Sequence, residues 1–150
     1  MSGDPRLVER VRPVLDAIGT KTVVAGERVG QASALKLAAN AWMLSLTAAA
    51  AQSIALTQGF GLDPGLFLEA IDGGPVNSPT AQLKGKSMIA GDFSASFALA
   101  SGVKDLRLAG EIRDGVAPEL LDGVRALFER AADEGHGGED IAAVYRVLRP

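Results

Sequence analysis

The sequence predicts a mainly α-helical protein, a helical bundle around one long helix that is preceded by a short helix–strand segment. An uncharged, alanine-rich stretch runs from Leu37 to Gln58. Apolar residues recur at helical spacing on either side of it, and a short β-branched run, Thr22–Ala25, stands alone. Because a single strand cannot form a sheet, we expect a helical body.

The first expected elements are a helix and a strand. Apolar residues at helical spacing predict a helix over Pro5–Leu15, with Gly19 as its stop. The run Thr22–Ala25, bounded by Gly26, predicts a strand. This strand either pairs with a second copy or is the remnant of a sheet that lies elsewhere.

The long helix is expected over Ala32–Gln58, which spans about 40 Å at the usual rise per residue. It lacks a charged face, so it must be covered on all sides. We expect a second copy of the chain to cover part of it near Ala48–Ala51, forming a homodimer through residues 32–58. Its length would suffice for a membrane span, but its alanine-rich, partly polar composition favours burial in protein and no membrane contact.

Shorter helices follow. Asp63 and Pro64 have the residue types of an N-cap and a first helical position, and Gly73 ends that helix. Further helices are expected over about Pro79–Ala90, Ser101–Arg113, Pro118–Glu134 and Gly138–Leu148, with a loop at Phe93–Phe97.

Composition excludes several function classes. The net charge of −3 argues against nucleic-acid binding, which needs a basic surface. The absence of cysteine excludes a disulfide scaffold, a zinc ribbon and a thiol nucleophile. The one histidine, His136, lies among glycines and predicts a helix–helix turn, so no metal is expected. No signal peptide is visible, and a cytoplasmic location is expected.

Three polar residues mark a candidate site on the long helix. Ser33, Lys36 and Asn40 stand at i, i+3 and i+7, on one helical face. A lysine and an amide so spaced can reach one small polar ligand, and a lysine can act as a general acid or base. Spacing alone leaves open that Lys36 lies along the surface and that Asn40 caps a loop carbonyl.

Four segments of the chain stand out as motifs: Gly30–Asn40, Gly91–Phe97, Val103–Ala109 and Gly135–Asp140. Together they resemble the β-hydroxyacid dehydrogenase family, within the 6-phosphogluconate dehydrogenase-like superfamily. Gly30–Asn40 is similar to its G-x-G-x-x-x-K-x-x-x-N motif, with Ala32 in place of the second glycine. Gly91–Phe97, Val103–Ala109 and Gly135–Asp140 resemble its G-D-F-x-x-x-F, K-D-L-x-L-A and G-H-x-x-x-D segments, in the family's order. The family includes 3-hydroxyisobutyrate dehydrogenases and glyoxylate/succinic semialdehyde reductases.

The resemblance implies a role for each matching residue. It makes Lys36 the catalytic acid/base on the substrate hydroxyl, with Asn40 and Ser33 binding the substrate. It makes Lys104 and Phe97 contacts of the cofactor, which is NAD or NADP. The substrate it implies is a small β-hydroxyacid or the corresponding aldehyde or keto acid.

The resemblance also implies a domain organisation. Residues 1–29 resemble the last helix and strand of the family's Rossmann domain, and residues 30–150 its all-α substrate and dimerisation domain. The chain contains no G-x-G-x-x-G fingerprint, so we expect the C-terminal part of an NAD(P)-dependent oxidoreductase, inactive alone. The alternatives are a catalytically silent helical dimerisation module and an imine reductase-like member, against which Lys36 argues.

Two residues beside these motifs are expected to be structural. Trp42 lies about 200° around the helix from Asn40, which favours packing in the core or at the dimer over substrate contact. Asp105, next to Lys104, is expected to form a structural pair or a cap rather than a catalytic carboxylate.

Overall fold

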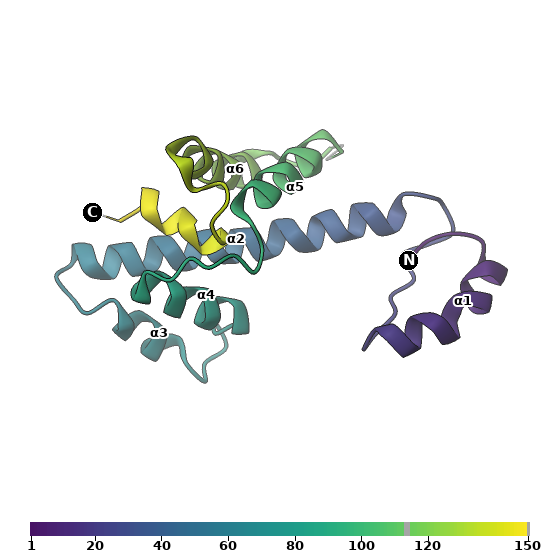
Figure 1. Ribbon diagram of the computed structural model, residues 1–150, viewed down its shortest axis with the longest axis horizontal. Coiled ribbons are helices and arrows are strands. Elements are labelled where there is room, and N and C mark those ends of the chain that lie inside the picture. The colour runs from purple at the N-terminus through teal and green to yellow at the C-terminus, as the bar shows by residue number, and fades with distance from the viewer. Residues whose placement is uncertain (113–114, 150) are drawn as a thin grey trace. The chain divides into compact units, whose positions relative to one another are not determined.

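The computed structural model describes residues 1–112 and 115–149 and is mainly α-helical, which confirms the predicted fold class (Figure 1). The chain divides into two compact units, Met1–Ala39 and Asn40–Pro150. The long helix runs through residues of both units. The domain boundary expected between residues 29 and 30 stays a prediction.

The helices lie close to their predicted positions. Their bounds are α1 Pro5–Ile18, α2 Gln31–Gly59, α3 Gly65–Ile71, α4 Pro79–Ala90, α5 Leu99–Glu111 and α6 Glu119–Ala131. A π-helical turn, Ala132–His136, follows α6, and a 3-10 helix, Ile141–Val147, takes the place of the last predicted helix. The predicted end of one helix at Arg113 lies outside the described residues.

In the first unit, the strand predicted at Thr22–Ala25 is wrong, since the described residues contain no strand. The segment is nevertheless bonded to the N-terminal residues through its backbone. The Ala25 amide donates to the Met1 carbonyl at 2.8 Å, and the Gly3 amide donates to the Gly26 carbonyl at 3.1 Å. A β-branched run needs a sheet to become a regular strand, and this unit offers only Met1–Gly3 as a partner.

The first helix of this unit is fixed by its N-cap. The Asp4 carboxylate accepts a hydrogen bond from the Arg6 amide at 2.8 Å, and Pro5 occupies the first helical position. Val8 is the buried residue of α1 and Leu15 is half-buried, whereas other large apolar residues of the helix, among them Val14 and Ile18, are exposed.

In the second unit, α2 contributes one face to the core. Its buried side chains recur at helical spacing and include Leu44, Thr47, Ala48, Ala51, Ile54 and Ala55. This chain alone does not cover the whole helix, because Trp42 is 66% and Leu56 51% exposed. Cover of the remaining face by a second copy stays a prediction. By length and composition alone, α2 is also the one described helix that could cross a membrane.

The tetra-alanine segment belongs to the core instead of the surface. Ala48, Ala50 and Ala51 are buried by other parts of the same chain, and only Ala49 is exposed. Within this chain Ala49 is therefore the alanine of this segment that is available to a partner, and the approach of a partner near Ala48–Ala51 stays a prediction. Small side chains here serve close packing within the chain.

The other helices of the second unit gather around α2, with α3 and α4 on one side and α5 and α6 on the other in Figure 1. Two glycines allow helices to pack closely, Gly85 of α4 against α3 and Gly102 of α5 against α2. A Cβ added at Gly85 would lie 2.6 Å from Leu68 Cδ2, and one at Gly102 would lie 3.0 Å from Leu44 Cδ2. The resulting core is centred on fully buried Phe128 and the 3-10 helix.

A buried ion pair connects α4 to the start of the 3-10 helix. Lys84 Nζ lies 2.8 Å from Asp140 Oδ1, and Ser96 Oγ donates to Asp140 Oδ2 at 2.8 Å. The amides of Phe97 and Ala142 also donate to this carboxylate. Burial raises the pKa of Asp140, but the hydrogen bonds from Lys84, Ala142, Ser96 and Phe97 outweigh it and hold that pKa at about 2.

Candidate active site

A cluster of three polar residues in the second unit brings two predicted site residues together. Asn40 Nδ2, on α2, donates to Asp105 Oδ2, on α5, at 2.5 Å. Lys104 Nζ lies 3.1 Å from the other oxygen of the same carboxylate, Oδ1. Asp105 is only 3% exposed. One buried carboxylate therefore links the predicted substrate-binding amide to the predicted cofactor-binding ammonium.

The positions of these residues follow from how α5 packs. Leu99, Val103 and Leu106 bury one face of that helix, and Asp105 lies beside this face, where it is buried too. Lys104 is one residue earlier, and its side chain is 63% exposed. The adjacent Lys–Asp pair thus puts a carboxylate inside and an ammonium at the surface.

The structural pairing expected for Asp105 is confirmed, but its connection to Asn40 was missed. The adjacency of Lys104 and Asp105 in the sequence was the available signal. Pairing with Asn40 could not be inferred from it, because 65 residues separate the two.

The hydrogen bond to Asp105 also orients the Asn40 amide. A carboxylate can only accept, so the NH2 group of Asn40 faces Asp105 and the amide oxygen Oδ1 is directed elsewhere. An amide oxygen held in this way can accept a hydrogen bond from a hydroxyl or an ammonium group.

Ser33 and Lys36 lie in the first turns of α2, in the first unit, and both are exposed. Gly30 precedes the helix with φ +92°, in the left-handed region, which explains the glycine of the motif at this position. The helix start is secured by the Ala34 amide, which donates to the Gly30 carbonyl at 2.9 Å. The roles of Ser33 and Lys36 stay predictions.

Phe97 is held mainly by its backbone. Its amide donates to Asp140 Oδ2 at 3.2 Å, and its carbonyl accepts from the Ile141 amide at 3.0 Å. Its ring is half-buried against the core, as is that of Phe93. Contact between Phe97 and a cofactor stays a prediction.

Two further residues have clear surroundings. The exposure of Trp42 rules out packing in the core of this chain, which leaves the expectation of packing at a dimer. His136 ends the turn Ala132–His136, where Gly135 has φ +95°, so the predicted helix–helix turn is confirmed. Within residues 1–112 and 115–149, no group of three or more His, Asp or Glu side chains could hold a metal ion.

Comparison with known proteins identifies relatives of one kind. A family model described as NAD-binding of NADP-dependent 3-hydroxyisobutyrate dehydrogenase matches residues 30–148. The chain is 35% identical to glyoxylate/succinic semialdehyde reductase 2, chloroplastic, of Arabidopsis thaliana, over 99% of this chain and 42% of that protein. It is 26% identical to L-threonate dehydrogenase of Haemophilus influenzae, over 98% of this chain and 50% of that protein.

Solved structures agree with these matches. The 3-hydroxyisobutyrate dehydrogenase from Salmonella typhimurium superposes with a TM-score of 0.88 at 26% identity, covering 97% of this chain and 52% of that one. The Mycobacterium tuberculosis 3-hydroxyisobutyrate dehydrogenase, solved with L-serine, gives a TM-score of 0.85 at 26% identity, covering 99% and 54%. The chain therefore spans about half the length of the relatives that it matches.

Proposed function

Since this chain belongs to the family of NADP-dependent 3-hydroxyisobutyrate dehydrogenases, we propose that it is the C-terminal, helical part of an NAD(P)-dependent oxidoreductase. The reaction is hydride transfer between the nicotinamide cofactor and a small β-hydroxyacid, or the corresponding aldehyde or keto acid. The observation that carries the proposal is the link from Asn40 through buried Asp105 to Lys104, which joins two of the family's motifs.

In this proposal Lys36 exchanges a proton with the substrate hydroxyl oxygen. In the direction of oxidation, the amine accepts the hydroxyl proton as the carbonyl forms; in the direction of reduction, the ammonium donates it. A proton must move in either direction, and a positioned acid/base typically supplies about a hundredfold or more in rate. The exposed position of Lys36 in the first turns of α2 supports this role.

Asn40 and Ser33 hold the substrate. One N–H of the Asn40 amide bonds Asp105, and its second N–H donates to the substrate oxygen, so that the hydroxyl proton stays available to Lys36. Asp105 keeps the amide in the orientation that makes this possible. Asp105 is thus a positioning residue, because it acts through Asn40. Holding the reacting groups in a fixed geometry lowers the barrier by removing their freedom beforehand.

The nicotinamide cofactor, when bound, supplies the hydride chemistry. The described residues fit a partial contact with it: Lys104 presents an exposed ammonium, suited to a phosphate or ribose oxygen, and the ring of Phe97 is only half-buried. The Gly-rich turn that usually holds a dinucleotide is absent from the sequence. We therefore propose that most of the cofactor is held outside residues 30–150.

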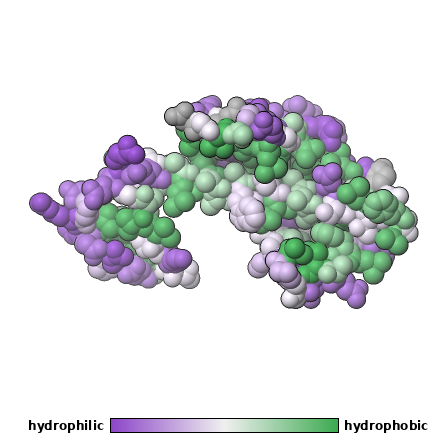
Figure 2. Space-filling view, turned by 180° about the vertical axis from the view of Figure 1, so that it is seen from behind, coloured by the Kyte–Doolittle hydropathy of each residue, from purple (hydrophilic) through white to green (hydrophobic). Residues whose placement is uncertain are grey.

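Assembly through α2 is a further part of the proposal. Trp42, Ala49 and Leu56 follow one another every seven residues along α2, and all three are exposed. Residues at this spacing lie on one face of a helix, which suits packing against a second helix. Apolar area extends over much of the second unit on the side seen in Figure 2. We propose that the face of α2 that carries Trp42, Ala49 and Leu56 packs against a second copy of the chain.

A hybrid protein tests the catalytic proposal. Residues 1–150 would follow the N-terminal part of the Arabidopsis reductase, replacing the matched 42% of that protein. The hybrid should oxidise NADPH when succinic semialdehyde or glyoxylate is added, and the same hybrid with Lys36→Ala should not. Equal activity of the two hybrids would contradict the proposal.

A catalytically silent dimerisation module is the second candidate for the isolated chain, favoured by the missing dinucleotide fingerprint. Titration of the 150-residue chain with NADH and NADPH separates the two descriptions. Micromolar binding by the chain alone would refute the silent module.

A further inference from the structure

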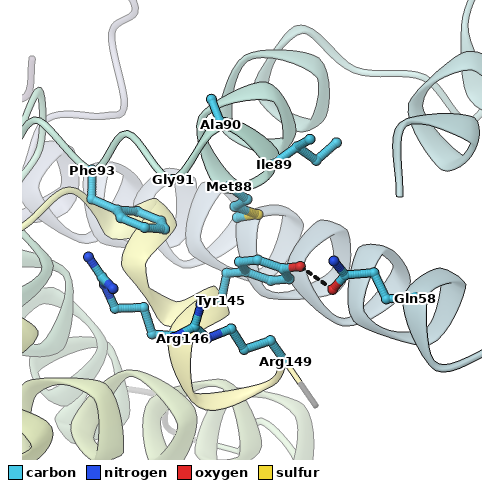
Figure 3. Close-up of a pocket in the computed structure, with 9 residues that line it drawn as sticks. All are labelled: Gln58, Met88, Ile89, Ala90, Gly91, Phe93, Tyr145, Arg146 and Arg149. Carbon is cyan, nitrogen blue, oxygen red and sulfur yellow. Dashed lines mark hydrogen bonds between the residues drawn. The ribbon is translucent and has the colours of Figure 1, made fainter. Parts of the chain in front are cut away.

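A cavity of about 590 Å³ in the second unit lies where α2 and α4 end and the 3-10 helix begins its last turn (Figure 3). Its wall includes Gln58, Met88, Phe93, Tyr145, Arg146 and Arg149. Gln58 stands 18 residues beyond Asn40 on α2, about 27 Å along the helix axis. The catalytic proposal assigns no role to any of these residues.

One cation on this wall is rigidly placed. Arg146 Nε and Nη2 donate to the Glu139 carboxylate at 2.8 and 3.3 Å, and its guanidinium lies 4.4 Å from the centre of the Phe93 ring. These contacts use one edge of the guanidinium and one of its faces. A guanidinium has five N–H donors, so donors remain for a ligand although the charge is balanced by Glu139.

The second cation has no carboxylate partner among residues 1–112 and 115–149. Arg149 is exposed, and its charge acts on the neighbouring phenol: burial raises the pKa of Tyr145, whereas the charge of Arg149 opposes that rise. The Tyr145 hydroxyl donates to Gln58 Oε1, as Figure 3 shows. Since this bond occupies the amide oxygen, the Gln58 NH2 group is the part available to a ligand.

We propose that this cavity binds a small monocarboxylate with an apolar body. Arg149, Arg146 and the Gln58 amide supply donors for the carboxylate, and Met88, Ile89 and Phe93 supply apolar contact. Arg149 has no carboxylate partner among residues 1–112 and 115–149, so its single positive charge matches the single negative charge of a monocarboxylate. The cavity also borders the C-terminal end of α4, where helix carbonyls disfavour additional negative charge, so a phosphate dianion fits less well.

Calorimetric titration of the 150-residue chain with hexanoate tests the proposal independently of any nicotinamide chemistry. We expect saturable binding at one site per chain. Arg149→Gln should raise the dissociation constant about tenfold, as the loss of one charge-assisted pair predicts. Gln58→Glu should weaken binding at least as much, because it places a carboxylate against the ligand. Arg107→Gln, which removes the same charge from the surface pair with Glu129, should leave binding unchanged.

Four results would overturn the proposal. The first is an absence of saturable hexanoate binding. The second is hexanol binding as tightly as hexanoate, which would make the cavity merely apolar. The third is hexyl phosphate binding more tightly than hexanoate, which would contradict the choice of a carboxylate. The fourth is a loss of binding in Arg107→Gln as large as that in Arg149→Gln, which would indicate a general effect of charge.

Discussion

Asn40 on α2 and Asp105 on α5 are joined by a hydrogen bond of 2.5 Å between Nδ2 and Oδ2, across 65 residues of sequence. The bond fixes which end of the amide faces away from Asp105. The same Asp105 carboxylate is a buried negative charge that lies beside the exposed ammonium of Lys104. Two side chains that the sequence motifs single out separately thus share one buried partner.

Asp105→Asn should therefore weaken catalysis without unfolding the chain. The substitution keeps the shape of the side chain but removes the charge that attracts Lys104 and strengthens the bond from Asn40. We expect kcat/KM of the hybrid with the Arabidopsis reductase to fall about tenfold when it carries Asp105→Asn, corresponding to about 1.4 kcal/mol. Most of the change should appear in KM for the hydroxyacid, measured by steady-state kinetics at saturating cofactor.

The matched control is Asp133→Asn, an exposed aspartate in the turn after α6. It should leave kcat/KM unchanged. An Asp105→Asn enzyme with unaltered KM for the substrate would contradict the positioning role.

Stability in acid should depend on Asp140. Its pKa in the folded chain is about 2, below the ordinary value of 3.8, so the folded state favours the ionised form. This contribution to the free energy of unfolding, about 2 kcal/mol, is fully present above about pH 4 and is lost as the pH falls towards 2. Urea unfolding at pH 6 and pH 2.5, followed by circular dichroism, measures the loss.

Two variants test this assignment. Ser96→Ala removes one hydrogen bond to the Asp140 carboxylate and should lower the free energy of unfolding at pH 6 by about 1 kcal/mol. Asp140→Asn leaves Lys84 buried without its counter-charge and should cost about 3–5 kcal/mol at pH 6, with a smaller further loss on acidification. If the free energy of unfolding of Asp140→Asn depended on pH as strongly as that of the unsubstituted chain, other carboxylates would be responsible for the loss of stability in acid.

Dimerisation should depend on the exposed face of α2. The double substitution Trp42→Glu and Leu56→Glu puts charges on that face, and we expect it to convert a dimer into a monomer in light scattering at micromolar concentration. Leu120→Glu, at an exposed leucine of α6, is the control and should stay dimeric. A stable monomer of the unsubstituted chain would refute the proposed assembly.

Local signals made some of the fold predictable. The helix Pro79–Ala90 has the predicted bounds because the residues at its ends act directly on the backbone. Ser78 Oγ accepts from the Ala81 amide at 3.0 Å, and Gly91 ends the helix with φ +68°. The motifs identify the candidate site residues, since both Asn40 and Lys104 lie in segments that resemble one family, and their roles stay predictions.

Other features depend on contacts that no local pattern encodes. The run Thr22–Ala25 has the composition of a strand but lacks a neighbouring strand in this chain. The uncharged composition of α2 does not reveal which of its faces packs inside the chain. The pair of Lys84 and Asp140 joins residues 56 positions apart, and neither residue type by itself predicts burial.

Lys36 is the proposed acid/base of a hydride-transfer reaction. The rate of hydride transfer in single turnovers of the hybrid with the Arabidopsis reductase tests this role, with Lys36→Ala compared with Lys86→Ala, an exposed lysine of α4, as control. We predict a fall of roughly a hundredfold or more for Lys36→Ala and no change for Lys86→Ala. A rate for Lys36→Ala within about tenfold of the unsubstituted hybrid, worth at most roughly 1.4 kcal/mol of barrier, would show that Lys36 is not the acid/base.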